Sequence, residues 1–292
     1  MFDSVSPRSI ASGTLRLGHI SDLHLSDRGR YPRNGLAPKD CDRHSNRLAQ
    51  RVLEEMEKAG VDHLVVTGDL TLSSEAAEFE RAAKLLRRWA DAGKLTIVPG
   101  NHDVWTAESV KTSRFLRMIG PDGRGMRKPA ASYPFAALPS PEVAIIAIDS
   151  SRYGEEPFST PGQIGSAQLQ ACRELVRENL KEGRAVLLAL HHHLMLPRER
   201  VPSDSLVAHM PLSDADKLVR LVSDVRVAGV LHGHRHCAFR VDIPGAAGPT
   251  PVLCAGSGSR VTSEPVRRAR GYVYEVDRGG IRSTQVVLAN AG

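Results

Sequence analysis

Five short segments of this 292-residue chain place aspartate, asparagine or histidine directly after an apolar run. Carboxylate, amide and imidazole groups are the side chains that bind first-row transition metals and transfer protons. No cysteine lies in these segments, which argues against a thiolate-bound structural zinc. The segments are Asp22-Leu23-His24, Gly68-Asp69, Gly100-Asn101-His102-Asp103, His191-His192-His193 and Gly233-His234-Arg235-His236.

Strands and helices must bring these distant segments together. Apolar runs of four to eight residues predict strands, and stretches with apolar residues three and four apart predict amphipathic helices. Their alternation predicts a layered α/β fold, in which the carboxyl ends of the strands share one edge and bind ligands. We expect strands at 15–20, 63–67, 95–98, 143–148, 185–190 and 227–231, and helices at 42–59, 74–92, 166–182 and 213–223.

The pattern changes after about residue 237 to short β-like segments separated by glycine and proline. RVDI, TPVLCAG and GYVYEV, with a turn at 277–280, predict antiparallel strands. No repeat of fixed period and no long linker divides the chain, so we expect one domain over 14–292. Within the chain we expect a flexible N-terminus over 1–13, a cap-like loop over 194–212 and a C-terminal β segment over 238–292.

The composition is that of an ordinary globular protein, with 41% hydrophobic and 25% charged residues. No run approaches the ~18 apolar residues of a membrane span, and no basic-then-apolar leader begins the chain. We therefore expect a cytoplasmic protein with no membrane partner. The four cysteines show no paired spacing, as expected for reduced thiols.

The net charge of +6 fits an anionic partner. Nucleic acid is not expected, because the arginines are scattered and aromatic residues make up only 4% of the chain. A small anionic substrate is also consistent with this charge. The sequence does not decide whether the protein forms a homo-oligomer.

Two aspartates, one asparagine and three or four histidines, up to seven potential ligands from these segments, exceed what one tetrahedral ion needs. Two ions that share a bridging carboxylate would use them all, and such a pair can bind a phosphoryl group and activate water. Oxygen and imidazole ligands suit Mn, Fe, Zn or Co. Gly68, Gly100 and Gly233 lack a Cβ, which allows sharp turns at the strand ends. Any one segment alone could be a helix cap or a turn, but the five together favour a metal site.

In their order, the five segments resemble the signature of the calcineurin-like metallophosphoesterase superfamily. The segments span residues 22–236, which is most of the chain. The resemblance implies a four-layer α/β/β/α sandwich with a dinuclear metal site at the C-terminal ends of the strands. Chain length and the C-terminal β segment look most similar to the bacterial class III cyclic-nucleotide and glycerophosphodiester phosphodiesterases.

The resemblance also implies a role for each site residue. One ion would be held by Asp22, His24 and His236, the other by Asn101, His191 and His234, with Asp69 bridging both. His102 would be the catalytic histidine that assists the leaving group. The histidine triplet leaves open whether His191 or His192 is the ligand, and we favour His191 because it comes first after the strand.

The remaining histidines and the loop arginines have less specific interpretations. His19, His44, His63 and His209 are expected to be surface or core residues, whereas His193 and His232 either line the pocket or are structural. Arginines in two loops could bind phosphate, although solvated loop charge is the simpler role. These arginines are Arg28, Arg30, Arg33, Arg198 and Arg200.

We therefore expect a metal-dependent phosphodiesterase that hydrolyses cyclic nucleotides or other small phosphodiesters through a hydroxide bridging the ions. A diester needs fewer cationic contacts than a monoester, and Arg235 should point away from the ions if its segment is extended. A pyrophosphohydrolase of nucleotide-linked substrates should carry an apolar lid, and a nuclease a partner-binding appendage. Neither feature is visible. A non-enzymatic scaffold should show gaps in the ligand set, and we find none.

Overall fold

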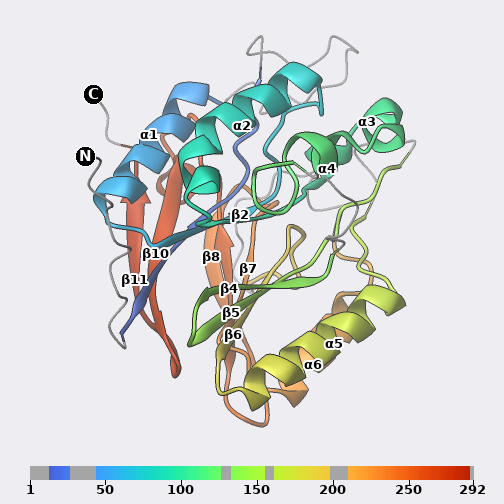
Figure 1. The fold of residues 1–292 in the computed structure, drawn as a ribbon, viewed down its shortest axis with the longest axis vertical. Helices are drawn as coiled ribbons and strands as arrows, with labels where there is room; N and C mark the ends of the chain where they lie inside the picture. The colour runs from blue at the N-terminus through green and yellow to red at the C-terminus, as the bar shows by residue number, and fades with distance from the viewer. Residues whose placement is uncertain (1–12, 27–43, 126–132, 155–160, 198–209, 290–292) are drawn as a thin grey trace, which may run out of the picture.

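The computed structural model describes residues 13–26, 44–125, 133–154, 161–197 and 210–289. Two β-sheets pack face to face in this part of the chain, and helices cover their outer faces (Figure 1). The strand order is β11-β10-β1-β2-β3 in the first sheet and β4-β5-β6-β7-β9-β8 in the second. The expected four-layer α/β/β/α sandwich is therefore confirmed.

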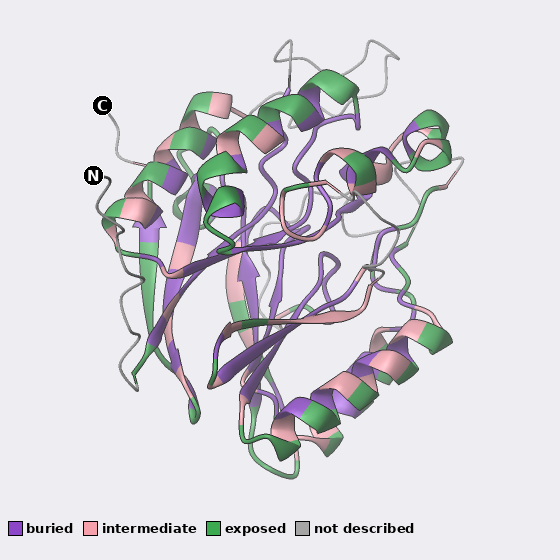
Figure 2. Ribbon diagram, viewed as in Figure 1, coloured by how far each residue is buried: buried purple, intermediate pink, exposed green. Residues whose placement is uncertain are grey.

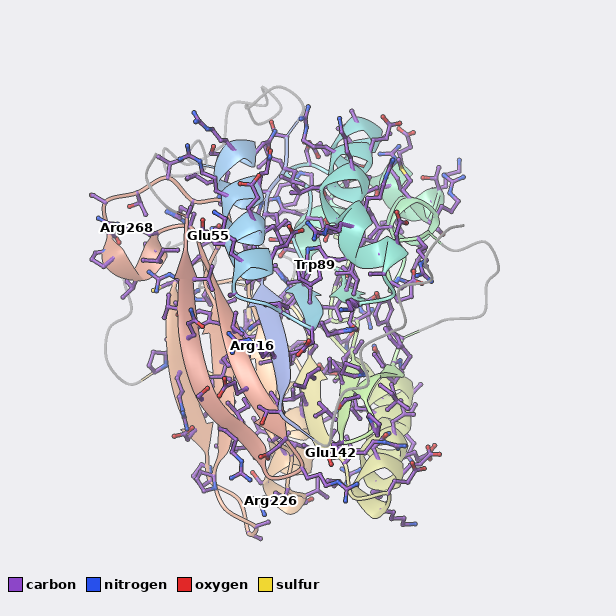
Figure 3. All side chains as sticks on the ribbon, turned by 60° about the vertical axis from the view of Figure 1, so that its left-hand side comes forward. Arg16, Glu55, Trp89, Glu142, Arg226 and Arg268 are labelled. Atoms are coloured by element: carbon purple, nitrogen blue, oxygen red, sulfur yellow. The ribbon has the colours of Figure 1, made fainter. Side chains whose placement is uncertain are left out.

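The five-stranded sheet has a parallel half and an antiparallel half. β1, β2 and β3 run parallel, while β10 is antiparallel to both β1 and β11. Arg16 on β1, labelled in Figure 3, reaches across these strands to Glu275 (3.1 Å) and Gln285 (3.4 Å). The strands are β1 (Leu15–Ile20), β2 (His63–Thr67), β3 (Leu95–Val98), β10 (Arg270–Asp277) and β11 (Gly280–Leu288).

The six-stranded sheet is mostly parallel. β5, β6, β7 and β9 form its parallel centre, and the edge strands β4 and β8 are antiparallel to their neighbours. Its strands are β4 (Phe135–Ser140), β5 (Val143–Ala147), β6 (Ala185–Ala189), β7 (Gly229–His232), β8 (Ala238–Ile243) and β9 (Thr250–Ala255).

Two pairs of long helices form the outer layers, and two short helices follow β3. Ser45 begins α1 by accepting a hydrogen bond from the Leu48 amide, which is why α1 starts four residues later than expected. Glu78 begins α2 by accepting from the Glu75 amide. α1 (Asn46–Lys58) and α2 (Ala76–Asp91) cover the first sheet, and α5 (Ser166–Lys181) and α6 (Ala215–Asp224) the second. The short helices are α3 (Ala107–Lys111) and α4 (Arg114–Met118).

Alternation along the strands produces three apolar layers. In β2, Leu64 and Val66 pack under the helices, whereas Val65 faces the other sheet. In β5, Ile146 packs against α5, whereas Ile145 faces the first sheet. The central strands are thus buried on both faces, as Figure 2 shows, and this explains their unbroken apolar runs.

Apart from the start of α1, the boundaries of the predicted strands and helices lie within two residues of the observed ones. The C-terminal β segment needs a correction, because it is divided between the sheets and β9 runs parallel to β7. The turn at 277–280 is confirmed. β4 was not predicted, because its sequence FAALPS has no clear alternation and contains proline.

Several predictions fall outside the described residues. They concern residues 1–12 of the expected flexible N-terminus, residues 198–209 of the cap-like loop, His209, Cys41 and the five loop arginines. The three described cysteines, Cys172, Cys237 and Cys254, are free and buried. No helix in the described ranges is both long enough and apolar enough to cross a membrane.

Candidate metal centre

The seven expected ligands come together at one end of the two facing sheets. Asp22 and His24 follow β1, Asp69 follows β2 and Asn101 follows β3. The other sheet contributes His191 after β6, and His234 and His236 after β7. All seven are at most 8% exposed. The site therefore lies between the sheets, at the carboxyl ends of parallel strands.

The backbone at these strand ends is strained. Among the described residues, seven non-glycine residues adopt a left-handed φ, and five of them are expected ligands. Such a conformation is costly for a residue with a Cβ and persists only where the surrounding structure enforces it. Strain concentrated on these ligands indicates a functional site. The five are Asp22 (52°), His24 (40°), Asp69 (53°), His234 (71°) and His236 (48°).

Close packing around the ligands explains the three glycines. A Cβ on Gly100 would lie 2.1 Å from Asp69 Oδ1, and one on Gly233 would lie 1.8 Å from Ser21 Oγ. Gly68 adopts a φ of +86°, and its Cβ would lie 2.6 Å from His191 Nδ1. Gly100 and Gly233 are thus required by close approach, and only Gly68 also by its backbone conformation.

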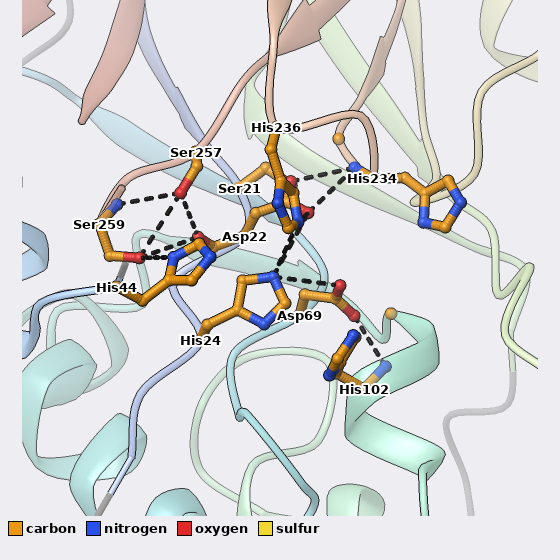
Figure 4. A network of polar contacts seen from close by, with 12 residues as sticks. Ser21, Asp22, His24, His44, Asp69, His102, His234, His236, Ser257 and Ser259 are labelled. Carbon is orange, nitrogen blue, oxygen red and sulfur yellow. Dashed lines mark hydrogen bonds and ion pairs between the residues drawn. The ribbon is translucent and has the colours of Figure 1, made fainter. Parts of the chain in front are cut away.

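One group of four ligands surrounds the first position, as Figure 4 shows. His236 Nε2 lies 2.9 Å from His24 Nε2 and 3.1 Å from Asp22 Oδ1. His24 Nε2 lies 3.5 Å from Asp69 Oδ2. Two ligands about 2.1 Å from one ion are about 3 Å apart when they are adjacent. These spacings therefore suit a shared cation.

A second group surrounds a neighbouring position. His191 Nε2 lies 3.4 Å from Asp69 Oδ2 and 3.1 Å from Asn101 Oδ1. His234 Nδ1 lies 3.1 Å from the same Asn101 oxygen and 3.2 Å from His191 Nε2. Asp69 Oδ2 is thus common to both groups, which is the arrangement expected of a bridging carboxylate.

The charges and polar atoms of the site also fit cations. Burial alone would raise the pKa of Asp22 and of Asp69, but neighbouring histidines lower both below the usual value. Burial likewise lowers the pKa of His191, yet the Asp69 charge outweighs it and raises that pKa to about 9. Asn101 Nδ2 is buried without a hydrogen-bond partner among the described residues, while its oxygen faces the histidines. Two buried carboxylates and an amide oxygen directed at the histidines are ligands that suit two cations.

The structure places His191, and not His192, among the ligands. His192 Nδ1 lies 2.9 Å from Ser150 Oγ, and its ring packs on Gly162, where a Cβ would come within 2.4 Å. His191 Nδ1 donates to the Thr67 carbonyl (2.7 Å), which leaves Nε2 free to bind an ion.

His102 lies beside the ligands without joining them. Its backbone amide donates to Asp69 Oδ1 (2.9 Å), and its Nδ1 donates to the Leu72 carbonyl (2.7 Å). The ring stacks on Trp105, with centroids 4.2 Å apart. Burial lowers the pKa of His102 to about 4, so the imidazole is neutral unless an anion binds beside it.

Asp103 is a positioning residue whose role no sequence pattern predicted. Its carboxylate accepts from the Gly100 amide (3.0 Å) and from both the amide and the hydroxyl of Thr71 (3.0 Å each). It thereby joins the chain after β2 to the chain after β3. Burial raises the pKa of Asp103 to about 7.

Two predictions about other histidines differ in outcome. His19 is a core residue as expected, with Nε2 2.9 Å from Thr67 Oγ1. His44 is neither a plain surface nor a plain core residue, because its ring lies 4.4 Å from that of His24. No sequence signal singles out His44, since it precedes a helix rather than following a strand.

The segment around Arg235 is bent rather than extended. The prediction that Arg235 points away from the ions assumed an extended segment, and that assumption is wrong. Arg235 is buried, and its charge adds to the effects of burial and of a neighbouring histidine that lower the pKa of His193 and of His232. His193 stacks on His234, and His232 Nδ1 donates to the Gly233 carbonyl.

Two facing sheets with a two-position ligand cluster at their carboxyl ends form a candidate dinuclear metal centre. The chain belongs to the calcineurin-like phosphoesterase family, whose sequence model matches residues 15–238. No curated protein sequence is a significant match. The family and the clustered ligands together indicate a metal-dependent phosphohydrolase with a dinuclear site.

Solved structures share this fold at low sequence identity. A dimetal phosphatase from Danio rerio matches with a TM-score of 0.58 and 14% identity, over 95% of this chain and 100% of its own. A purple acid phosphatase from yellow lupin (Lupinus luteus) seeds gives 0.62 and 11%, over 97% of this chain and 55% of its own. A putative 5′-nucleotidase from Staphylococcus aureus gives 0.54 and 13%, over 96% and 55%. This chain thus spans about half the length of the last two, and the likeness concerns the fold alone.

Proposed function

We propose that this protein is a phosphodiesterase that uses two ions, of Mn, Fe, Zn or Co, to hydrolyse cyclic nucleotides or other small phosphodiesters. The main support for a two-ion site is the position of one oxygen atom. Asp69 Oδ2 lies 3.5 Å from His24 Nε2 and 3.4 Å from His191 Nε2. When bound, the two ions polarise the phosphoryl group and activate water. The ligands hold the ions, and His102 is placed beside them.

The charges close to the ligands support a diester rather than a monoester. The neighbouring groups that lower the pKa of Asp22 and of Asp69 most strongly against the effect of burial are histidines. Arg260 contacts His236 Nδ1 (3.1 Å), the ring nitrogen that faces away from the other ligands. A diester carries one negative charge, so it depends less on extra cations than a monoester dianion does.

His102 supports the departure of the ester oxygen in this proposal. Hydrogen bonding through Nδ1 to the Leu72 carbonyl fixes the ring and directs Nε2 away from that carbonyl. An anionic substrate beside the ring raises its pKa, since a nearby negative charge favours the imidazolium. Nε2 can then donate a proton to the leaving oxygen.

The diagnostic experiment compares paired substrates at one pH and with one metal. We expect bis-nitrophenyl phosphate, and a 3′,5′-cyclic nucleotide, to be hydrolysed with higher kcat/KM than nitrophenyl phosphate or a nucleoside monophosphate. A clear preference for the monoesters would contradict the diester assignment and favour a phosphatase. That activity is the one named for the Danio rerio and lupin proteins.

A further inference from the structure

His44 lies against the first metal position although it belongs to none of the five ligand segments. Its ring centroid lies 4.4 Å from that of His24 and 5.2 Å from that of His236. One ring nitrogen from each of these three residues falls within 4.8 Å of the other two. His44 is half-buried, whereas His24 and His236 are buried. Figure 4 shows the three imidazoles together, and His44 is the most exposed of them.

A network of hydrogen bonds holds the His44 ring in this place. His44 Nδ1 lies 2.7 Å from Ser259 Oγ, and Ser259 Oγ donates to the Asp22 carbonyl (3.2 Å). Ser257 Oγ donates to the same carbonyl (2.8 Å). The backbone is tied as well, because the Ser45 amide donates to the Ser259 carbonyl (2.9 Å). The position of His44 is therefore coupled to that of the ligand Asp22.

The same network determines which ring nitrogen is available. With its hydroxyl hydrogen directed to the Asp22 carbonyl, Ser259 can accept from His44 Nδ1–H. His44 Nε2 then carries the lone pair, and it has no hydrogen-bond partner within the described ranges. An imidazole whose Nδ1–H is held by an oxygen and whose Nε2 is open has the orientation typical of a metal-binding histidine.

We propose that His44 Nε2 is a further nitrogen ligand of the ion held by His24 and His236. The inference rests on the dinuclear site of the proposed function, and it adds a residue that the five ligand segments do not contain. Three imidazoles favour a borderline ion such as Zn or Co over Mn at this position. Ser259 acts as a positioning residue, since it contacts His44 and not the ion.

The experiment measures metal binding by the full-length protein. Metal-free wild type and His44→Ala are titrated with Co²⁺, and the affinity of each equivalent is determined with a competing chelator. Proton NMR of the Co²⁺ proteins then counts the strongly shifted, exchangeable imidazole N–H signals, one for each ligand histidine with a protonated second nitrogen. His63→Ala is the control, because His63 is a buried histidine that bonds to Thr96 Oγ1 (2.8 Å) outside the centre.

We expect wild type and His63→Ala to bind two Co²⁺ ions, whereas His44→Ala binds one of them about 10-fold or more weakly. One shifted N–H signal should disappear in His44→Ala alone. Ser259→Ala, which keeps the imidazole but removes its anchor, should weaken the same ion to a smaller extent. If His44→Ala does not fold, His44→Gln, which preserves most of the side-chain volume, replaces it in both measurements.

Two results would overturn the inference in distinguishable ways. If the His44 variant binds both ions with wild-type affinity and keeps every shifted signal, His44 lines the pocket without binding an ion. Fewer than two ions in the wild type would overturn the dinuclear site itself, and this inference with it.

Discussion

At the scale of single residues, Asp69 connects the two metal positions. Its Oδ2 lies 3.5 Å from His24 Nε2 and 3.4 Å from His191 Nε2, while its Oδ1 accepts from the His102 amide (2.9 Å). One carboxylate thus joins both groups of ligands to the expected catalytic histidine. A buried anion between two cations also offsets their mutual repulsion.

Replacement of this carboxylate should therefore affect both ions together. We expect Asp69→Ala to lose metal at both positions and to retain no more activity than the metal-free protein. Elemental analysis after dialysis and the rate of diester hydrolysis provide the measurements. Asp22→Ala is the matched control, because it removes a buried carboxylate of the first position only. Normal metal content and turnover in Asp69→Ala would show that Asp69 does not bridge.

His102 should matter for rate and not for metal binding. We expect His102→Ala to keep both ions and to lose about 10²- to 10⁴-fold in kcat, the usual contribution of general acid catalysis. The loss should be smaller for a nitrophenolate leaving group, which departs without a proton, than for an alkoxide. Equal losses with both leaving groups would assign His102 to binding or structure instead.

At the scale of elements, the site depends on how five strands end. Left-handed residues and closely packed glycines turn the chain immediately after β1, β2 and β7. Asp103 then fixes the turn after β2 against the turn after β3, through hydrogen bonds to Thr71 and Gly100. The ligand geometry therefore depends on the backbone of these turns as well as on the ligands.

Gly68→Ala tests this dependence. Its φ of +86° costs a side-chain-bearing residue about 1–2 kcal/mol, and the added Cβ would also lie 2.6 Å from His191 Nδ1. We expect a larger loss of unfolding free energy than this strain alone causes, together with weaker metal binding. Gly183→Ala is the control, since its φ is +75° and nothing lies within 4 Å of the added Cβ. Equal effects of the two changes would contradict the role of Gly68 in placing His191.

The elements that the sequence predicted are those with a strong local signal. β2 and β6 are mostly apolar runs with a polar ligand two residues after each strand ends, so both the strand and its chemical role could be predicted. The edge strand β4 has no such pattern. His44 could not be predicted either, because only the tertiary packing of the start of α1 on the chain after β9 brings it to the centre. Positions fixed by contacts distant in sequence leave no local periodicity.

At the scale of the whole molecule, the metal centre joins the two sheets. Asp22, Asp69 and Asn101 follow strands of the five-stranded sheet, while His191 and His234 follow strands of the six-stranded sheet. Within the described ranges, an apolar cluster between the sheets includes Val65, Ile145 and Leu187. Ions at this place should therefore stabilise the native arrangement of both sheets, in addition to their role in catalysis.

Metal removal should lower the stability of the entire protein. A ligand that binds only the native state adds about 2.7 kcal/mol to the free energy of unfolding when the free ligand concentration is 100 times its Kd. We expect chelation to lower the Tm in one cooperative transition, and added Mn²⁺ or Co²⁺ to restore it. The Asp69→Ala variant should show neither effect. A Tm in wild type that does not respond to chelation or metal would contradict a site that joins the sheets.

With two ions bound at this centre, we expect the protein to hydrolyse a phosphodiester. Titration of the metal-free protein with Co²⁺, with bound metal and bis-nitrophenyl phosphate hydrolysis followed in the same samples, tests it most directly. We predict that each chain binds two ions and that turnover rises in proportion to the fraction of chains that hold both ions. Full turnover with one ion bound, or in the presence of excess chelator, would contradict the account.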